Sequence, residues 1–302
     1  MLLSVIGTSQ IIEDHLRSAV KNGFKLHSIS TTKNIESSNL KKLYKKYSFK
    51  KKYSNWKKMY LETKNSKNMT YLVCPRIKDT FNISKFFLQN DKIIFVEKPF
   101  STKIKSYLQL EKYKKQIFVG YNRVYYENLK YLKSQKFSNT LININCIEKN
   151  NKSFIENSCH VVSIINFLFN DLKVVYRFKN QNHIFCRLYS KRKKIFINFL
   201  VIFNVPKNFS IEIFWKNKVF ELKPIERMRI YDKIQPRKSK KGKFFEPVVS
   251  IDRSEHEFSK LKPGFENQWK KFKIFIKTKK TDTNLNFAKS TISLALDILG
   301  EK

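Results

Sequence analysis

The sequence is short of acidic residues, alanine, glycine and proline. Its 302 residues include 24 Asp plus Glu against 62 Lys plus Arg, so the formal net charge is +38, and only three alanines, six glycines and seven prolines occur. Lys, Asn, Ile, Phe and Tyr are abundant, and these preferences follow A/T-rich codons. The positive charge is therefore weaker evidence of a nucleic-acid partner than its size suggests, although codon bias does not fully account for the scarcity of acids.

Cysteine is scarce and has no motif spacing. The chain has four, Cys74, Cys146, Cys159 and Cys186, and no C-x-x-C pair occurs among them. This arrangement fits neither a zinc site nor a disulfide framework, so we expect reduced thiols and no bound metal.

No long hydrophobic run is present either. The longest mostly apolar stretch, Ile195–Phe203, is far shorter than the roughly 20 residues that a membrane-spanning helix needs. Met1–Ser4 has no basic region typical of a signal peptide. With 41% apolar and 15% aromatic residues the chain can bury a core, so we expect a soluble, cytoplasmic protein and no global disorder.

The first 120 residues alternate short apolar runs with helical patterns. Such alternation predicts an α/β fold with a doubly wound parallel sheet. The expected strands are 2–6, 24–30, 71–74, 93–96 and 116–120, and the expected helices are 11–22, 38–47, 80–88 and 102–114.

The rest of the chain changes character, because apolar and polar residues alternate with period two. This pattern predicts an α+β domain with a largely antiparallel sheet covered on one face. The expected strands are 141–145, 172–176, 183–189, 194–203, 209–213 and 218–222, and the expected helices are 159–169, 265–276 and 288–299. We expect a long surface loop or arm over 229–262. The expected domains are 1–121, for dinucleotide binding, and 122–302, for substrate binding and oligomerisation, with a C-terminal helix that could pack back on the first domain.

The turn after the first expected strand is Gly7-Thr8-Ser9-Gln10-Ile11-Ile12. A strand, a turn and a helix N-terminus are the context in which a dinucleotide pyrophosphate binds. Only Gly7 remains of the G-x-G-x-x-G pattern, since Ser9 and Ile12 replace the other glycines. The turn alone is therefore equally compatible with an ordinary strand–turn–helix.

The second expected strand is followed by Thr31, Thr32 and Lys33 and by no acidic residue. An acid here would bind an adenosine ribose and repel a 2′-phosphate, whereas two hydroxyls and a lysine suit that phosphate. We therefore expect NADP in preference to NAD. The alternative is that Lys33 is simply one of many lysines.

Lys98 lies directly after an expected strand, in the tripeptide Glu97-Lys98-Pro99. In a doubly wound sheet the carboxyl ends of strands line the ligand crevice. A lysine there can donate to a substrate hydroxyl and stabilise developing negative charge on oxygen. The alternative is a surface lysine at a turn.

His160 begins an apolar helix, and Glu156 lies four residues before it. Histidine commonly takes a proton from an alcohol near pH 7, and a carboxylate could orient it. The alternative is a capping histidine or one buried in the core.

The densest basic stretch, 41–58, interleaves lysines with aromatic residues. Such a stretch could neutralise phosphates and stack bases. The alternative is an amphipathic helix and loop whose Leu43, Tyr44 and Tyr47 face a core. We favour it, because runs of charged residues usually form a solvated surface.

Several motifs occur in an order that resembles the glucose–fructose oxidoreductase/inositol dehydrogenase/rhizopine catabolism (Gfo/Idh/MocA) family of NAD(P)-dependent sugar oxidoreductases. The resemblance spans nearly the whole chain, and E-K-P followed by G-Y-N-R is its most specific part. The motifs are Gly7–Ile12, Val73-Cys74-Pro75, Val96–Phe100, Val119–Arg123, Asn157–His160 and Lys262–Phe265.

The resemblance implies an N-terminal Rossmann domain and a C-terminal mixed sheet whose open face often mediates oligomers. It also implies that Lys98 contacts substrate and nicotinamide, that His160 is the acid/base group, and that Glu156 takes the place of a common aspartate. The implied cofactor contacts are Gly7, Thr8, Ser9, Gln10, Ile11, Cys74, Pro75 and Glu97. Tyr121, Asn122 and Arg123 would lie near cofactor and substrate, and the alternative for them is a polar hinge that only packs domains together.

Five positions depart from the family pattern: Ser9, Ile12, Asp79, Val124 and Ser163. We expect an oxidoreductase that moves a hydride between a nicotinamide cofactor and a secondary alcohol or ketone of a sugar or nucleotide sugar, and we expect a homo-oligomer. The alternatives are a drifted member that only binds cofactor or sugar, and a basic nucleic-acid-binding protein.

Overall fold

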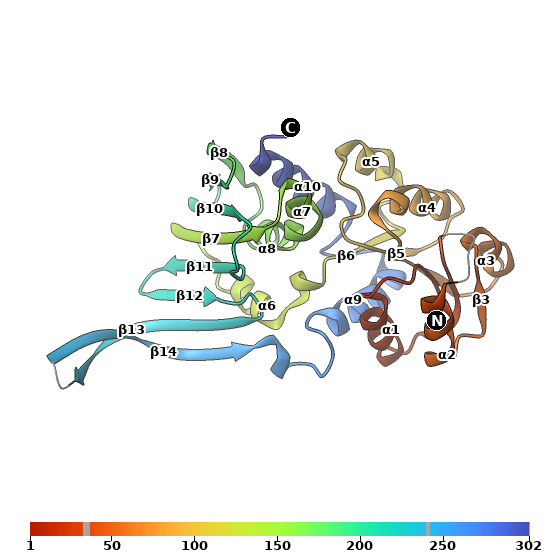
Figure 1. Ribbon diagram of the computed structural model, residues 1–302, viewed down its shortest axis with the longest axis horizontal. Coiled ribbons are helices and arrows are strands. Elements are labelled where there is room, and N and C mark those ends of the chain that lie inside the picture. Colours follow the sequence, from red (N-terminus) through yellow and green to blue (C-terminus); the bar gives the residue numbers. More distant parts are fainter. Residues whose placement is uncertain (33–36, 240–241, 302) are drawn as a thin grey trace. The chain divides into compact units, whose positions relative to one another are not determined.

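The computed structural model describes residues 1–32, 37–239 and 242–301, and the chain forms two compact units (Figure 1). The first unit combines Met1–Tyr125 with Gly264–Ile292, and the second combines Tyr126–Pro263 with Ser293–Lys302. These units differ from the expected contiguous domains 1–121 and 122–302, because residues 264–292 return to the first unit and the division falls within the last helix.

The first unit is a doubly wound parallel sheet, as the sequence predicted. Its six strands have the order β3-β2-β1-β4-β5-β6, and every strand pair is parallel. The strands are β1 (Leu2–Ile6), β2 (Lys25–Ser30), β3 (Lys51–Tyr53), β4 (Met69–Val73), β5 (Ile94–Glu97) and β6 (Ile117–Gly120). The helices are α1 (Ile12–Lys21), α2 (Ser38–Lys46), α3 (Trp56–Thr63), α4 (Ile77–Gln89), α5 (Ile104–Gln109), α9 (Phe265–Thr278) and the short η1 (Glu111–Tyr113) and η2 (Asn122–Tyr125).

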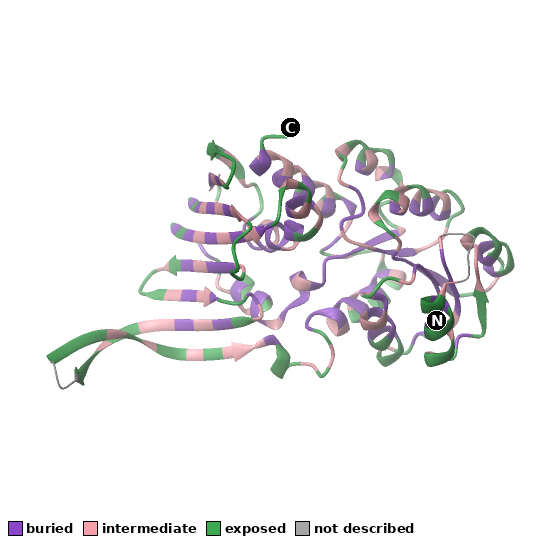
Figure 2. Cartoon of the chain, in the orientation of Figure 1, coloured by how far each residue is buried: buried purple, intermediate pink, exposed green. Residues whose placement is uncertain are grey.

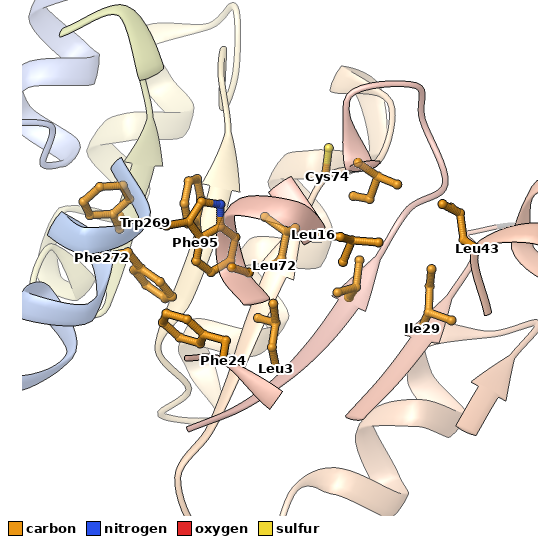
Figure 3. Packing of buried hydrophobic residues seen from close by; sticks show 14 of the residues in the cluster. Leu3, Leu16, Phe24, Ile29, Leu43, Leu72, Cys74, Phe95, Trp269 and Phe272 are labelled. Carbon is orange, nitrogen blue, oxygen red and sulfur yellow. The ribbon is translucent and has the colours of Figure 1, made fainter. Parts of the chain in front are cut away.

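Aromatic rings fill the space between this sheet and α9 (Figure 3). Trp269 and Phe272 of α9 are fully buried, and their rings lie 4.8 and 5.2 Å from that of Phe95 on β5. Phe24 lies 5.0 Å from Trp269, centroid to centroid. Because aromatic pairs at this spacing contribute about 0.5–1.5 kcal/mol beyond their buried area, α9 is an integral part of the first unit.

The sequence reading missed β3 and α3 within the basic stretch. We expected a loop after the helix of residues 38–47, but Lys51–Tyr53 pairs with β2, and Trp56–Thr63 is helical. A strand of three residues, two of them exposed lysines, carries no usable periodicity. Tertiary packing supports the helix instead, since the Trp56 ring meets that of Phe86 on α4 edge-on at 5.0 Å.

The second unit contains a largely antiparallel sheet of eight strands, again as predicted. Its order is β14-β13-β12-β11-β7-β10-β9-β8, and only β7 and β10 pair in parallel. The strands are β7 (Thr140–Glu148), β8 (Lys173–Lys179), β9 (His183–Ser190), β10 (Ile195–Phe203), β11 (Ser210–Trp215), β12 (Lys218–Leu222), β13 (Arg227–Ser239) and β14 (Gly242–Ser254). The helices are α6 (Glu127–Ser134), α7 (Asn151–Ser153), the π-helical η3 (Phe154–Ser158), α8 (Cys159–Phe169), η4 (Glu255–Glu257) and the end of α10 (Leu285–Leu299).

The long surface loop or arm expected over 229–262 is mostly a pair of long strands. β13 and β14 have 13 residues each and pair antiparallel, with Ile234 opposite Pro247 and Pro236 opposite Phe245. The prolines and charges of this segment misled the sequence reading. Both prolines lie in the outer part of the hairpin, where no further strand needs their missing N–H groups.

Helices cover one face of the eight-stranded sheet, and the other face is open. Along β7 and β10 buried residues alternate with partly or fully exposed ones, which gives the banding in Figure 2. Exposed apolar residues of neighbouring strands pair across the open face, with Phe196 opposite Leu141 and Leu141 opposite Phe214.

Within the described residues, no helix combines the length and apolar character that a membrane crossing requires.

Candidate functional site

The register of the parallel sheet brings several motif residues to one edge. Ile6 pairs with Val73, and Val73 pairs with Val96. The residues that follow these strands are therefore neighbours at the carboxyl edge of the sheet, where ligands bind in folds of this type. They include Gly7, Cys74 and Lys98.

Gly7 is required by the close approach of two chain segments. Its φ of +114° lies in the region that favours glycine, and a Cβ at this position would lie 2.1 Å from the carbonyl oxygen of Cys74. No other residue fits without moving one of the two segments. The remaining glycine of the motif thus sets the path of the turn that opens α1.

This turn forms one wall of a pocket of about 460 Å³. Its volume is within the usual range for small-molecule sites. Seven of the expected cofactor contacts line it together: Gly7, Thr8, Ser9, Thr31, Thr32, Cys74 and Pro75. Gln10 instead lines a neighbouring pocket of about 190 Å³, Ile11 is the N-cap of α1, and Lys33 lies outside the described residues.

The departures at Ser9 and Ile12 have local roles. Ser9 Oγ lies 3.4 Å from Cys74 Sγ, so the Ser9 side chain occupies space beside the turn that a glycine would leave empty. Ile12 is fully buried in the hydrophobic core. No side chain caps the N-terminus of α1, which leaves backbone donors for an anion.

The first turn of α1 carries two acidic residues, Glu13 and Asp14, that would oppose an anion. Glu13 accepts hydrogen bonds from Lys46 and, at 3.3 Å, from the Tyr47 hydroxyl. The bond from Lys46 is the main cause of the lowered pKa of Glu13, so this carboxylate stays ionised but paired.

Four pocket residues were not singled out from the sequence: Ser37, Ser38, Asn39 and Arg76. Ser37 is the N-cap of α2, and its hydroxyl accepts from the Leu40 backbone N–H at 3.2 Å. Arg76 directly follows Cys74-Pro75, and this adjacency was the available signal. With Thr31 and Thr32 these residues give the pocket several hydroxyls and one guanidinium, a set that suits a phosphate-bearing ligand.

Cys74 is unsuited to nucleophilic chemistry. It is 2% exposed, and burial, reinforced by the charge of Glu97, raises the pKa of its thiol well above the ordinary range. The thiol therefore stays protonated and packs beneath the pocket.

Glu97 and Lys98 are tied together at the end of β5. Glu97 Oε2 accepts from the Lys98 backbone N–H at 2.9 Å, and Glu97 Oε1 lies 2.8 Å from His15 Nε2. The Lys98–Pro99 peptide bond is cis. These bonds use one acceptor position of each carboxylate oxygen and fix the orientation of the carboxylate. A contact between Glu97 and the cofactor stays a prediction.

The segment after β6 is mostly internal. Tyr121 is fully buried and packs edge-on against Phe287, with ring centroids 5.6 Å apart. Asn122 is 7% exposed, and Arg123 is partly exposed on η2. Substrate contact by these three residues stays a prediction, as does the alternative of a packing hinge.

In the second unit, His160 lies in the first turn of α8 and is partly exposed. Its carbonyl oxygen accepts from the Ser163 hydroxyl at 2.7 Å. Glu156 lies on η3, with Oε1 3.9 Å from Lys152 Nζ. The coupling of Glu156 to His160 stays a prediction, and a described neighbour of this carboxylate is the Lys152 ammonium.

A buried carboxylate that the sequence reading missed anchors the start of α8. Glu148 at the end of β7 is 8% exposed and accepts from Asn157 Nδ2 at 2.9 Å and from the Ser158 hydroxyl. It thereby fixes the two residues that precede Cys159 and His160. The signal was its place in the strand, since it continues the buried alternation of Ile144 and Cys146.

The apolar and aromatic side chains of residues 41–58 pack against the fold, whereas most of the lysines are exposed. Leu43 is buried, Lys51 pairs with Glu62 at 2.8 Å, and the Trp56 ring packs on Phe86. This packing favours the amphipathic alternative over base stacking.

Among residues 1–32, 37–239 and 242–301, no group of three or more His, Cys, Asp and Glu is arranged to hold a metal ion.

Comparison with known proteins agrees with this geometry. Residues 1–121 match the sequence model of an oxidoreductase family with an NAD-binding Rossmann fold, GFO_IDH_MocA. No curated protein sequence matches the chain.

Solved structures share the fold at low identity. A dehydrogenase (MviM) from Clostridium difficile superposes with a TM-score of 0.76 at 16% identity, covering 100% of this chain and 99% of its own. UDP-N-acetylglucosamine 3-dehydrogenase GnnA from Acidithiobacillus ferrooxidans superposes with a TM-score of 0.71 at 12% identity, covering 100% of this chain and 97% of its own. A putative NADPH-dependent oxidoreductase from Desulfitobacterium hafniense superposes with a TM-score of 0.76 at 11% identity, covering 100% of this chain and 95% of its own. The resemblance inferred from the motifs is confirmed by this match of residues 1–121 to the Gfo/Idh/MocA family model, an oxidoreductase family with an NAD-binding Rossmann fold.

Proposed function

We propose that this protein is an NAD(P)-dependent oxidoreductase that moves a hydride between a nicotinamide cofactor and a secondary alcohol or ketone of a sugar or nucleotide sugar. The observation that carries the proposal is the pocket at the carboxyl edge of the parallel sheet, where Gly7 passes against Cys74. Lys98 follows β5 at the same edge of the sheet but does not line this pocket. The family match supports the oxidoreductase class, and the sugar rests on the resemblance of the motifs.

The residues of the pocket fit a dinucleotide. Gly7, which carries no side chain, and the uncapped N-terminus of α1 suit a pyrophosphate. Thr31, Thr32 and Arg76 offer hydroxyls and a guanidinium, and none of the described residues that line the pocket is acidic, which suits a 2′-phosphate. We therefore propose NADP as the preferred cofactor, with NAD as the alternative.

When bound, the nicotinamide cofactor would supply or accept the hydride. The chain's own residues would orient the substrate and handle the proton. Lys98 Nζ would donate a hydrogen bond to the reacting oxygen and stabilise its negative charge. His160 would exchange the proton of that oxygen, with Glu156 supporting its charged form.

We also propose that the protein is a homo-oligomer. Phe196, Leu141 and Phe214 are 46, 45 and 39% exposed and form a continuous apolar row on the open face of the eight-stranded sheet. Exposed contiguous apolar surface of this kind marks association sites. A cytoplasmic location remains our expectation from the sequence.

The test is a fluorescence titration with NADPH and NADH, followed by turnover assays on panels of sugars and nucleotide sugars. The proposal expects saturable binding, tighter for NADPH, and turnover with at least one panel member. Absence of binding for both cofactors would refute it. Binding without turnover would favour the alternative of a family member that has lost hydride transfer. The side chains of Ser9 and Ile12, which replace two glycines of the motif, are the structural reason to consider it.

A further inference from the structure

A fully buried histidine on α1 contacts the carboxylate that precedes Lys98. His15 is 0% exposed, and its Nε2 lies 2.8 Å from Glu97 Oε1. On the other side of the ring, Nδ1 lies 3.3 Å from the indole nitrogen of Trp269. A buried imidazole with both nitrogens in hydrogen-bond contact has a fixed orientation.

The indole of Trp269 determines which ring nitrogen of His15 carries the proton. An indole N–H can only donate, so His15 Nδ1 must accept and carries no proton. The ring proton of the neutral imidazole is then on Nε2, which donates to Glu97 Oε1. The short His15–Glu97 contact is therefore a hydrogen bond from a neutral histidine to a carboxylate and not an ion pair.

The chain of bonds continues to the backbone of Lys98. The second carboxylate oxygen, Glu97 Oε2, accepts from the Lys98 N–H at 2.9 Å. Position 120 must lack a side chain here, because a Cβ on Gly120 would lie 3.3 Å from Glu97 Oε1 and 2.6 Å from the Phe95 ring. The bonded orientation of Glu97 thus depends on both His15 and Gly120.

We propose that His15 is a positioning residue for Lys98, acting through Glu97. By holding one carboxylate oxygen, it turns the other toward the Lys98 amide and so fixes the backbone from which the Lys98 side chain extends. The inference rests on the proposed role of Lys98 in hydride transfer. His15 itself touches neither cofactor nor substrate in this scheme.

Two substitutions at position 15 separate hydrogen bonding from packing. His15→Leu keeps apolar bulk but removes the donor, whereas His15→Gln places an amide N–H near the position of Nε2. Leu16→Ala is the matched control, because Leu16 is the next residue of α1, is fully buried, and loses core packing when truncated. Each variant is measured for kcat, KM, NADPH affinity and thermal stability.

We expect His15→Leu to lower kcat at least tenfold with less than a threefold change in NADPH affinity, and His15→Gln to recover most of that loss. Leu16→Ala should lower the melting temperature and leave kcat within a factor of two. The proposal is overturned if His15→Leu changes only the melting temperature, as the control does, or if Gln is no better than Leu.

A second measurement needs no variant to be active. Nitrogen-15 NMR of labelled His15 in the whole protein should show a neutral ring protonated on Nε2, and the amide resonance of Lys98 should move in His15→Leu but not in Leu16→Ala. A ring protonated on Nδ1, or an unmoved Lys98 amide, overturns the inference. If the wild type turns over no substrate while these signals appear as expected, the proposed function fails and the bonded chain stands.

Discussion

The backbone at Gly7 lies so close to Cys74 that a methyl group on Gly7 would be 2.1 Å from the Cys74 carbonyl oxygen. This contact joins the ends of β1 and β4 and shapes the wall of the 460 Å³ pocket. Packing of the fold and the shape of the proposed cofactor site therefore depend on the same missing side chain.

Replacement of Gly7 by Ala should damage both. We expect the free energy of unfolding to fall by about 3 kcal/mol, from backbone strain together with the clash, and NADPH affinity to fall more than tenfold. Gly23→Ala is the control, since Gly23 also has positive φ, +81°, but meets only Lys273 Nζ at 3.6 Å. Urea unfolding and fluorescence titration measure the two effects; equal losses of affinity in both variants would contradict this role of Gly7.

Arg76 should determine the preference between cofactors. Its guanidinium lines the pocket beside threonine and serine hydroxyls, so Arg76→Ala should weaken NADPH binding about tenfold, as expected for the loss of a charged hydrogen bond. NADH binding should change less than twofold. Lys78→Ala, two residues further along the chain and outside the pocket lining, should alter neither affinity. Parallel titrations of the three proteins give the answer, and a matching loss for NADH would exclude a specific 2′-phosphate contact.

Lys98 and His160 should affect turnover far more than cofactor binding. Lys98→Ala removes a donor to the reacting oxygen, and we expect kcat to drop roughly 100-fold or more with NADPH affinity within threefold. His160→Ala should cost a similar factor and flatten the pH dependence of kcat between about pH 5 and 8. Steady-state kinetics across that pH range, with thermal melts to exclude unfolding, provide the measurement. Unchanged kcat in either variant would remove that residue from the proposed mechanism.

The open sheet face should mediate self-association. Phe196→Glu places a carboxylate in the apolar row, and burying an unpaired charge costs several kcal/mol, so the oligomer should dissociate. Leu61→Glu is the control, because Leu61 is 61% exposed on α3, a helix of the first unit that is not part of that sheet. Light scattering after size exclusion reports the mass of each; a wild-type monomer would refute the homo-oligomer.

Glu255 gives stability a defined pH dependence. It is 3% exposed and accepts from the backbone N–H groups of Glu127 and Asn128 at the start of α6. Burial is the main cause of its raised pKa. A carboxyl whose pKa is raised on folding contributes its full stability below the unfolded value of 4.5 and loses it as pH rises through the folded value. The stability difference between the wild type and Glu255→Gln should therefore shrink as pH increases from 4 to 8, in urea unfolding at constant salt; a difference that grows would reverse the assignment.

Periodicity in the sequence was sufficient for the strongly patterned elements. β1 and α8 have the predicted bounds, and β9 is one residue longer than predicted, because continuous or alternating apolar runs leave one favourable burial arrangement. The same reasoning failed for β3, α3 and the β13–β14 hairpin. β3 and α3 are rich in lysine and depend on neighbours distant in the sequence, such as Phe86 packed on Trp56. The hairpin contains prolines and many charges, which are atypical of strands.

The sequence by itself determined the family, the parallel and antiparallel sheets, and the candidates Gly7, Lys98 and His160, because these are properties of local pattern and motif. Only the tertiary structure decided that Arg76 joins the pocket, that Glu148 anchors the start of α8, and that His15 and Trp269 hold Glu97. Hydrogen bonds between residues separated by as many as 254 positions depend on strand order and helix packing, and no local pattern encodes them.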